Sequence, residues 1–492
     1  MIPIVTPTEM AAIDEAAPEP VDELIERAGA ALARRAVRLL GGTYGRRVVV
    51  IAGKGNNGAD GRAAAVRLRG RGVRVAVIDA TDAPLSLPAA DLVIDAAYGT
   101  GFRGEWNPPD PGDSPVLACD IPSGVDGVTG GSRGALRATA TVTFAALKPG
   151  LLLGDGAVLA GRIEVADIGL DATSARAQLV ERSDAVAVVP RRSRQAHKWQ
   201  SGVRIVGGSP GMSGAAYLCA RAAGRAGAGM VVCSAPGVAA QDLALPTEAV
   251  GRSLPGDGWV AEVLDDIDRF AALVIGPGLG RDEATLAAAR ELLAAAPVPV
   301  IVDADGLMAV AGHEHVARNR LGPTVLTPHD GEFAALTGER PAADRFGAVR
   351  DVAARYGCTV LLKGATTLVA DPPGEVAAVS TGDARLATAG TGDVLSGVLA
   401  AFVGTAASDG AGPTPERLRA AVAGAAWVHG AAARRGPAAG MLSTDLPDLV
   451  GAELASLAAH SPDLRPNRAE SGRSGRKLRE VRPRDASWDR GQ

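Results

Sequence analysis

The stretch LATAGTGDVLSGVLA, at residues 386–400, joins a glycine-rich turn to an acid and then directly to a predicted helix. Gly390 and Gly392 can adopt positive φ, which turns successive backbone N–H groups inward. Leu395, Val398 and Leu399 follow the i, i+3, i+4 spacing of a buried helix face. The stretch therefore predicts a tight turn that leads into a core helix.

Asp393 stands at the N-terminus of this predicted helix. Free N–H groups and the positive end of the helix dipole would hold a phosphate there and favour the carboxylate form of Asp393. This combination predicts a phosphoryl-transfer site with Asp393 as its base. The alternative is an ordinary capped helix after a glycine turn, and the short motif alone does not decide between the two.

Length and composition indicate a multidomain α/β enzyme. The chain has 492 residues, 47% of them hydrophobic, which predicts two to three domains with substantial cores. Its 63 glycines and 3% aromatic residues are typical of a loop-rich α/β protein. The net charge of −4 gives no polybasic character, so we expect no nucleic-acid partner.

The charges near the N-terminus and the lengths of the apolar runs indicate the cellular compartment of the protein. Glu9, Asp14 and Glu15 have the wrong charge for a signal peptide, and no apolar run reaches the ~18 residues that a membrane span needs. We therefore expect a cytoplasmic protein with no membrane partner. As a separate expectation, the protein is a homo-oligomer. The four cysteines show no CxxC pairing, which predicts buried free thiols.

Lysine is rare in this chain. Only five of the 51 basic residues are lysines, and four of these, Lys54, Lys148, Lys198 and Lys363, lie in or beside turns that contain glycine or proline. A compact ammonium suits a phosphate or proton-transfer site better than a guanidinium does. Chance surface lysines are the alternative.

The first half begins with a helix predicted at 22–40, a buried strand at 48–52 and the turn GKGNNGADG at 53–61. A helix at 62–68 and a strand at 73–78 follow. The turn satisfies G-x-G-x-x-G, and Asp79 lies about 20 residues beyond it, as in a dinucleotide-binding dehydrogenase. However, Asn56, Asn57 and Asp60 crowd the phosphate position and suit polar or cation coordination better.

Further strands are predicted at 91–95, 116–119 and 141–144. Parallel strands bring their carboxyl ends to one edge of a sheet, where ligands bind. The polar side chains that we expect at this edge are Asn57, Asp95, Asp120, Ser123 and Lys148. Their amide, carboxylate and hydroxyl oxygens suit a hard cation.

The second half repeats the rhythm of strand, turn and helix, with strands at 203–206, 273–275, 298–302, 324–326 and 360–362. This rhythm predicts a second α/β domain with a mainly parallel sheet. Residues 171–195 lack sustained apolar periodicity, so we place the boundary near Ser183. His313 and His315 flank Glu314 in a predicted loop, where we expect a solvated turn and no metal site.

Ten ordered motifs resemble those of a known family. GKGNNGADG, DAAYGTG, DIPSGVD and TFAALKPG resemble the signatures of the NAD(P)H-hydrate epimerase domain. HKWQSGVRIVGGSPGMSGAA, VIGPGLG, VDADGL, LTPHDGEF, LLKGATT and LATAGTGDVLSG resemble those of the ribokinase-like, ADP-dependent NAD(P)H-hydrate dehydratase domain. Together they span about residues 5–450, in the order of the bifunctional bacterial repair enzymes.

The resemblance implies an α/β fold, with a Rossmann-like three-layer epimerase domain at 5–183 and a ribokinase-like dehydratase domain at 184–460. The remaining 461–492, rich in Arg, Pro, Gly and Ser, is predicted to be a disordered tail. The implied activity interconverts the R and S forms of hydrated NAD(P)H and dehydrates the S form at the expense of ADP, giving AMP and phosphate. The implied cofactors are potassium in the first domain and magnesium with ADP in the second.

For the first domain the resemblance implies that Asp120 and Lys148 are the acid/base pair, and that Asn57, Asp95 and Ser123 hold potassium. The residues that would contact the hydrated nucleotide are Asn56, Asn57, Gly58, Ala59, Asp60, Gly99, Thr100, Gly101, Phe102, Arg103, Gly104, Glu105 and Asp120.

For the second domain it implies that Asp393 is the base. The residues that would bind the adenine nucleotide are Lys363, Gly364, Ala365, Thr366, Thr367 and Gly392. Those that would contact the hydrate are Gly214, Ala215, Gly278, His329 and Asp393.

The chain departs from the family pattern at three positions. Ala59 replaces a glycine, and if that position needs positive φ the alanine costs about 1 kcal/mol or more. Asp330 replaces a proline and Trp199 a glycine, and we expect neither to touch the chemistry. Two alternatives stay open: a ribokinase-like small-molecule kinase with a degenerate first domain, and a first domain that serves as a non-catalytic scaffold.

Overall fold

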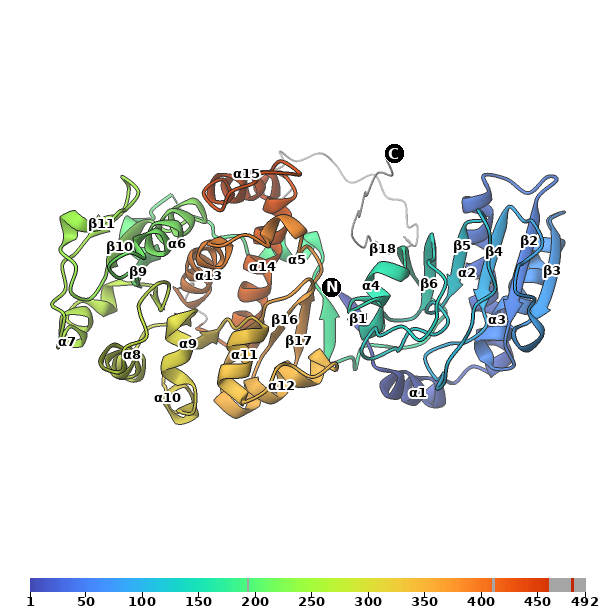
Figure 1. Cartoon of the computed structure of the whole chain (residues 1–492), viewed down its shortest axis with the longest axis horizontal. Coiled ribbons are helices and arrows are strands. Elements are labelled where there is room, and N and C mark those ends of the chain that lie inside the picture. Colours follow the sequence, from blue (N-terminus) through green and yellow to red (C-terminus); the bar gives the residue numbers. More distant parts are fainter. Residues whose placement is uncertain (193, 409–411, 460–478, 482–492) are drawn as a thin grey trace. The chain divides into compact units, whose positions relative to one another are not determined.

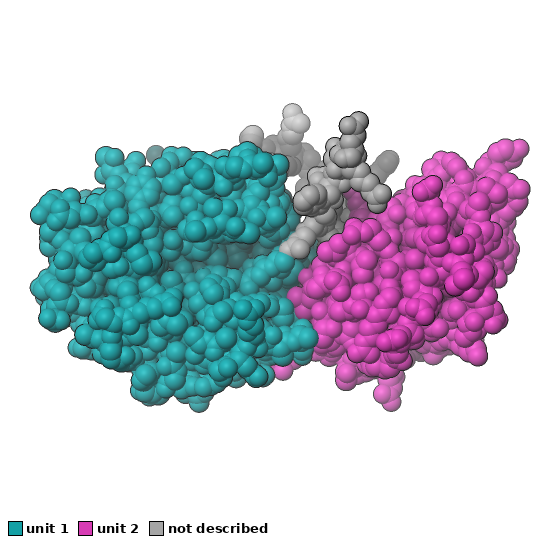
Figure 2. All heavy atoms as spheres, viewed as in Figure 1, with its two compact units in different colours: residues 1, 178–469 teal, residues 2–177, 470–492 magenta. Residues whose placement is uncertain are grey.

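The computed structural model describes residues 1–192, 194–408, 412–459 and 479–481, and these form two compact units (Figure 2). Residues 2–177 and 470–492 make up the N-terminal unit, and residues 1 and 178–469 make up the C-terminal unit. The division falls between Ala177 and Gln178, a few residues before the predicted boundary at Ser183.

A parallel sheet lies at the centre of the N-terminal unit, in the order β7-β6-β5-β4-β2-β3 (Figure 1). Its strands are β2 (Arg47–Ala52), β3 (Arg74–Asp79), β4 (Leu92–Ala96), β5 (Val116–Cys119), β6 (Ala140–Phe144) and β7 (Arg162–Ala166). The remaining elements are β1 (Ile2–Ile4), α1 (Pro7–Ala16), α2 (Val21–Leu40), α3 (Asn56–Arg69) and α4 (Gly156–Leu159). The predicted strands and the helix at 22–40 are confirmed.

Two separate apolar layers cover this sheet. On one face Leu32 of α2 and Leu68 of α3 pack against Val48 and Val50. On the other face Val49 joins a cluster that includes Trp106 and Leu136, which come from loops. Both faces are therefore buried, which explains why the strands are continuous apolar runs.

Helix α3 begins earlier than predicted. It starts at Asn56, after the N-cap Gly55, and not at residue 62. The glycines that suggested a turn allow close packing instead, because a β-carbon on Gly58 would lie 1.9 Å from the carbonyl oxygen of Gly53. Ala59 lies in the first turn of this helix and is absent from the described residues with positive φ. The strain considered for Ala59 therefore does not arise.

The predicted disordered tail, 461–492, lies outside the described residues except for β18 (Arg479–Val481). These three residues pair antiparallel with β7. Backbone pairing supplies hydrogen bonds that composition does not reveal.

The C-terminal unit contains a larger sheet in the order β8-β17-β16-β15-β14-β13-β12-β9-β10-β11 (Figure 1). The strands from β15 to β11 are parallel, and β16 and β17 are antiparallel. Their bounds are β8 (Ala177–Leu179), β9 (Gly202–Val206), β10 (Met230–Ser234), β11 (Val250–Gly251), β12 (Ala272–Ile275), β13 (Val300–Val302), β14 (Thr324–Leu326), β15 (Thr359–Leu362), β16 (Thr367–Ala370) and β17 (Val376–Val379). The α/β class with a mainly parallel sheet is confirmed.

The helices of the C-terminal unit flank the sheet (Figure 1). They are α5 (Arg182–Ala187), α6 (Ser213–Arg225), α7 (Val260–Leu264), α8 (Glu283–Ala295), α9 (Asp305–Val310), α10 (Glu314–Arg318), α11 (Asp330–Thr337), α12 (Arg345–Tyr356), α13 (Thr391–Ser408), α14 (Pro415–Ala433) and α15 (Leu446–Ala458).

Helix α13 lies in the core of this unit. Val394, Val398 and Leu399 are fully buried in a cluster with residues of α6 and α14. A β-carbon on Gly397 would lie 2.2 Å from the carbonyl oxygen of Cys219, so α6 and α13 pack with their backbones close together. Within the described part of the chain α13 alone is long and apolar enough to span a membrane, and 67% of it is buried inside the unit. A core helix accounts for these properties.

Substitution at the two neighbouring positions Gly58 and Ala59 of α3 should lower stability to different extents. Ala59→Gly should leave the fold intact and lower stability by about 0.5–1 kcal/mol, because glycine gains no favourable φ there and loses helix propensity. Gly58→Ala should disrupt the turn against Gly53. Thermal denaturation of the full chain compares them, and a stabilised Ala59→Gly variant would contradict the helical assignment.

Candidate active sites

The polar residues predicted at one edge of the N-terminal sheet do lie at the carboxyl ends of its strands. Asp95 lies in β4, Asp120 directly follows β5, and Lys148 comes shortly after β6. Asn57 is in the first turn of α3, which follows β2. The parallel topology places these four strand ends at the same edge.

Lys148 and Asp120 form a buried pair. The Lys148 side chain is 1% exposed, and its Nζ donates to Asp120 Oδ1 at 2.5 Å and to Thr143 Oγ1 at 2.8 Å. Thr143 Oγ1 itself donates to Asp120 Oδ1 at 2.9 Å. Asp120 has φ +64°, a conformation that non-glycine residues rarely adopt. The carboxylate is therefore held in one orientation with a cation beside it.

Asp95 and Ser123 form a second polar cluster. Ser123 donates from its hydroxyl to Asp95 Oδ1 at 2.6 Å and from its backbone N–H to Oδ2 at 2.9 Å. Burial raises the pKa of Asp95, although these hydrogen bonds oppose the shift. The Asn57 amide lies near Gly99, and its Nδ2 is buried without a hydrogen-bond partner. An amide with an orphaned end can turn its oxygen toward a cation.

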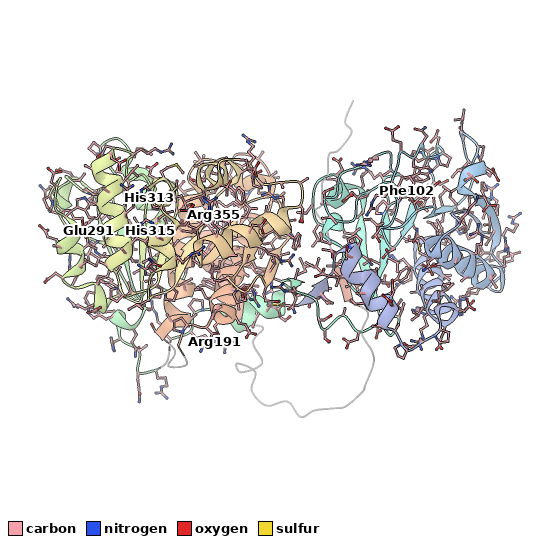
Figure 3. The ribbon with its side chains drawn as sticks, turned by 90° about the horizontal axis from the view of Figure 1, so that it is seen from below. Phe102, Arg191, Glu291, His313, His315 and Arg355 are labelled. Carbon is pink, nitrogen blue, oxygen red and sulfur yellow. The ribbon has the colours of Figure 1, made fainter. Side chains whose placement is uncertain are left out.

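A cavity of about 520 Å³ opens beside these groups. The predicted contacts that line it are Asn56, Asn57, Asp60, Gly99, Thr100, Gly101, Phe102 and Asp120, together with the base candidate Lys148. Gly58, Ala59, Arg103, Gly104 and Glu105 are not among its lining residues. The Phe102 ring stacks on Tyr98 at 4.1 Å between centroids, and Figure 3 labels its position.

Asp60 differs from the other acids of the cavity. Burial, with the charges of Asp120 and Asp14, raises the pKa of Asp60 to about 8. Asp60 is therefore mainly protonated at neutral pH and can donate a proton.

The G-x-G-x-x-G match does not form a dehydrogenase site. Asp79, which would bind a ribose, forms an ion pair with Arg62. Arg62 also donates to the carbonyl oxygen of Gly53 at 2.6 Å. The acid that the fingerprint needs is thus engaged by the protein itself.

In the C-terminal unit Asp303 and Lys363 form the centre of the second site. Asp303 follows β13 and is 1% exposed, and its Oδ1 accepts from Lys363 Nζ at 2.6 Å. Thr327 Oγ1 donates to Asp303 Oδ1 at 2.7 Å, and Ser396 Oγ donates to Oδ2 at 2.6 Å. Burial alone would raise the pKa of Asp303, but Lys363 and these hydrogen bonds outweigh it and lower the pKa.

Asp393 lies in the first turn of α13, as predicted. Burial, followed by the charge of Asp303, raises the pKa of Asp393 to about 7. Gly390 has φ +94°, and a β-carbon on Gly392 would lie 3.7 Å from Lys363 Nζ. The turn thus brings a carboxyl group of near-neutral pKa and a lysine together at the start of α13.

His429 of α14 supports this turn. Its side chain is 6% exposed, and Nε2 lies 2.9 Å from the carbonyl oxygen of Thr391. Burial lowers the pKa of His429 to about 4, so the ring is neutral and Nε2 carries the donated proton. His429 therefore fixes the start of α13.

His329 caps helix α11. Its Nδ1 accepts from the backbone N–H groups of Gly331 and Glu332, at 2.9 and 3.2 Å. Glu332 Oε2 accepts in return from the His329 N–H at 2.9 Å and lies 3.6 Å from Lys363 Nζ. The cap leaves the exposed Nε2 of His329 as an N–H donor.

The other predicted contacts surround the same centre. Gly278 has φ +63°, and a β-carbon there would lie 3.1 Å from Cβ of Ala215. Gly214 and Ala215 lie in the first turn of α6. Residues 363–367 connect β15 to β16, and Thr367 Oγ1 donates to the carbonyl oxygen of Gly364 at 3.4 Å. This turn also contains Ala365 and the buried Thr366.

The sequence did not single out four residues that organise this site: Asp303, Thr327, Ser396 and His429. Asp303 was visible as the acid directly after a buried strand, in VDADGL. Ser396 and His429 gave no signal, because only tertiary packing brings them to Asp303 and Thr391.

The prediction that His313 and His315 both lie in a loop is wrong for His315. Helix α10 begins at Glu314, so His315 is helical. The centroids of the two rings are 6.2 Å apart, and Glu314 accepts from Arg355 Nε at 2.8 Å. Figure 3 labels His313, His315 and Arg355. Among the residues that the structure describes, no group of three or more His, Cys, Asp or Glu side chains is arranged to hold a metal ion.

Comparison with known proteins identifies the family of both units. The family model for NAD(P)H-hydrate dehydratase matches residues 203–454, and the model for the YjeF-related protein N-terminus matches 21–86 and 78–150. The bifunctional NAD(P)H-hydrate repair enzyme Nnr of Moorella thermoacetica is 37% identical, over 91% of this chain and 96% of its own. The chain belongs to the bifunctional NAD(P)H-hydrate repair enzymes.

A further relative and a solved structure are also similar to this chain. The protein of the same name from Mycobacterium tuberculosis is 39% identical, over 80% of this chain and 86% of its own. A crystal structure of the ADP/ATP-dependent NAD(P)H-hydrate dehydratase from Bacillus subtilis is 27% identical and covers 56% of this chain and 97% of its own, with a TM-score of 0.47. As a bifunctional repair enzyme, the chain combines an epimerase domain and a dehydratase domain, which decides against the dehydrogenase, small-molecule kinase and scaffold alternatives.

Proposed function

We propose that the N-terminal unit epimerises hydrated NAD(P)H at Asp120 and Lys148, and that the C-terminal unit dehydrates the S form at Asp393. ADP is the proposed phosphoryl donor and yields AMP and phosphate. The observation that carries the proposal is the convergence of Asp393, Gly392 and Lys363 on one site. We further propose a cytoplasmic homo-oligomer.

The dehydratase chemistry solves a leaving-group problem. The hydroxyl of the hydrate is a poor leaving group, and its phosphate ester is a good one. Asp393 removes the hydroxyl proton as the oxygen attacks the terminal phosphorus of ADP, and the bond from that phosphorus to AMP breaks. The ester then loses phosphate with its electron pair, and loss of a ring proton restores the dihydronicotinamide.

Lys363 and the start of α13 would hold the phosphate groups of the nucleotide during this step. Lys363 supplies a point charge, and its pKa is raised because the charges of Asp303 and Glu332 outweigh burial. The N–H groups at the start of α13 would stabilise charge on the transferring phosphoryl group. Magnesium would neutralise the phosphates. Glu332 is the carboxylate that suits it, because its Oε2 accepts from the His329 N–H and leaves Oε1 for a cation, whereas both Asp303 oxygens already accept from Lys363, Thr327 and Ser396.

Epimerisation requires the carbon–oxygen bond of the hydrate to break and to form again on the opposite face. An acid protonates the departing hydroxyl as water, and a base then removes a proton from the water that returns. Asp120 and Lys148 share a hydrogen bond at the cavity wall and can exchange these protons. Asp60 adds a protonated acid to the same cavity. The loop that carries Phe102 would cover the nicotinamide.

Potassium fits the Asp95 cluster. Asn57, Asp95 and Ser123 offer amide, carboxylate and hydroxyl oxygens without sulfur or imidazole. The Asn57 Nδ2 donor has no hydrogen-bond partner, so no hydrogen bond at that end opposes a turn of the amide that would bring its oxygen to a cation. When bound, the cation would fix the loop after β4, since Ser123 Oγ also accepts from the Tyr98 N–H at 2.8 Å.

Replacing potassium with tetramethylammonium should slow epimerisation and lower the thermal midpoint of the full chain, because a ligand that binds only the folded state stabilises it. Dehydration of pure S hydrate should not change. Asp95→Asn should abolish the potassium dependence of both readouts. Equal epimerisation rates in the two cations would show that the metal assignment is wrong.

Lys363→Ala should weaken nucleotide binding far more than hydrate binding, because the ammonium acts as a clamp for phosphates. Isothermal calorimetry with ADP measures the first effect, and the KM for the hydrate measures the second. Lys198→Ala is the matched control, since Lys198 lies beside Trp199, with Nζ 5.9 Å from the ring centroid. Unchanged ADP affinity would remove Lys363 from the site.

Asp393→Asn should reduce dehydration by about 10²–10⁴-fold, the usual contribution of a positioned base. A base acts when deprotonated, so kcat/KM of the unaltered enzyme should rise with pH and level off above about 7. The variant should lose this pH dependence and keep its ADP affinity and its epimerase activity. Dehydration that survives in the folded variant, or a loss of stability without a specific loss of turnover, would refute the role of Asp393.

A further inference from the structure

Arg345 joins two turns of the C-terminal site. It is the first residue of α12, and its side chain is 19% exposed. NH1 donates to Asp330 Oδ2 at 3.0 Å and NH2 donates to Oδ1 at 2.8 Å, which is a bidentate pair. NH2 also donates to the carbonyl oxygen of Lys363 at 3.1 Å.

The two anchors of Arg345 belong to different parts of the site. Asp330 directly follows His329, in the turn assigned to the hydrate. Lys363 begins the turn assigned to the nucleotide, and a β-carbon on the next residue, Gly364, would lie 3.2 Å from Arg345 NH2. Asp330 itself contacts Arg345 and not Lys363, so it would act on the nucleotide turn only by orienting the Arg345 side chain.

The placement of Arg345 is itself fixed. The side chain of Asp344 caps α12 by accepting from the Gly347 N–H at 2.9 Å, which sets the position of the first helical residue. Asp330 lies in the first turn of α11, whose start is fixed by the His329 cap. Arg345 thus connects two capped helix starts to the end of β15.

A second link joins the same two turns from the inside. Glu332 accepts from the His329 N–H and lies 3.6 Å from Lys363 Nζ. The ammonium of Lys363 is consequently held by Asp303 and Glu332, while its backbone carbonyl is held by Arg345. The Nζ atom and the backbone carbonyl of Lys363 are therefore both held, and Arg345 links that carbonyl to Asp330.

We infer that Arg345 is a positioning residue for dehydration, which holds the Lys363 turn in register with the His329 turn and so couples nucleotide binding to hydrate binding. This inference rests on the proposed function. A planar guanidinium can bond a carboxylate and a carbonyl at once, which an ammonium cannot do with the same geometry. Coupling between two ligands is reciprocal, so if the hydrate tightens the binding of ADP, ADP tightens the binding of the hydrate by the same factor.

The test is two-substrate kinetics of dehydration in the full chain, with Arg345→Ala and Arg345→Lys. Arg345→Ala should raise the KM for ADP about tenfold, as expected for the loss of a charged hydrogen bond. The factor by which saturating hydrate lowers the KM for ADP should fall toward one. Arg345→Lys should give an intermediate result, because it keeps the charge and loses the fork. Epimerisation in the same chain should not change.

Two further variants make the test specific. Arg350→Ala is the matched control, since Arg350 lies on the same helix and donates to the carbonyl oxygen of Gly374, outside the site, at 2.9 Å. It should leave the coupling factor unchanged. Asp330→Asn should reproduce part of the Arg345→Ala effect, and the double variant should be no worse than Arg345→Ala alone, because Asp330 acts through Arg345.

The outcomes separate this inference from the proposed function. Unaltered ADP KM and coupling factor in a folded Arg345→Ala protein would overturn the inference, and so would a lowered thermal midpoint with both kinetic quantities unchanged. If Arg345→Ala does not fold, Arg345→Lys and Asp330→Asn decide by the same two quantities. A failure of Lys363→Ala to weaken ADP binding would instead overturn the nucleotide site itself.

Discussion

The ion pair between the buried Asp303 and the partly exposed Lys363 is the interaction on which the C-terminal site depends. Removing Lys363 would leave the Asp303 carboxylate buried without its cation, a loss that costs about 3–5 kcal/mol in fully buried pairs. Asp303 also accepts from Thr327, after β14, and from Ser396, on α13, so it ties the sheet to the core helix. Its charge helps to raise the pKa of Asp393. One carboxylate therefore orients Lys363 and helps to set the pKa of Asp393, the proposed base.

The N-terminal unit uses a related arrangement with different strands. Lys148 is buried against Asp120, and both follow strands of a parallel sheet. Among the described residues the non-glycine positions with positive φ are Asp120, Ala145 and Ala304. Each lies in or beside the Asp120–Lys148 pair or the Asp303–Lys363 pair. Ala145 lies between Phe144 and Ala146, whose carbonyl oxygens accept from Lys148. Ala304 directly follows Asp303. Unfavourable backbone conformations thus gather where each aspartate must hold a fixed orientation.

The strands and the edge where the sites lie were predictable, because buried parallel strands are continuous apolar runs and their carboxyl ends share one edge. The start of α3 was not predictable, because Gly55, Asn56 and Gly58 are residues typical of turns. The helix can begin at Asn56 because Gly58 packs closely against Gly53. The family motifs led to Asp393, Lys363 and Asp120.

Other parts of the two sites lie beyond local patterns. The packing of α13 and α14 brings His429 to Thr391 and Ser396 to Asp303, and no residue spacing in the sequence indicates these two contacts. The ion pair of Asp330 with Arg345 was not predictable for the same reason, because Arg345 lies on the next helix. Sequence patterns report what a residue contributes to its own element, whereas these contacts join different elements.

The four cysteines bear on how this protein would tolerate oxidants. Cys119, Cys219, Cys233 and Cys358 are all buried and free, and burial raises the pKa of each thiol, that of Cys233 and Cys358 to about 12. Peroxides and alkylating agents react with the thiolate form of cysteine. Burial disfavours that form at all four positions and also shields the sulfur atoms from solvent. Neither active site contains a thiol in its chemistry. The enzyme should therefore keep working under oxidative stress, without a reductant to restore it.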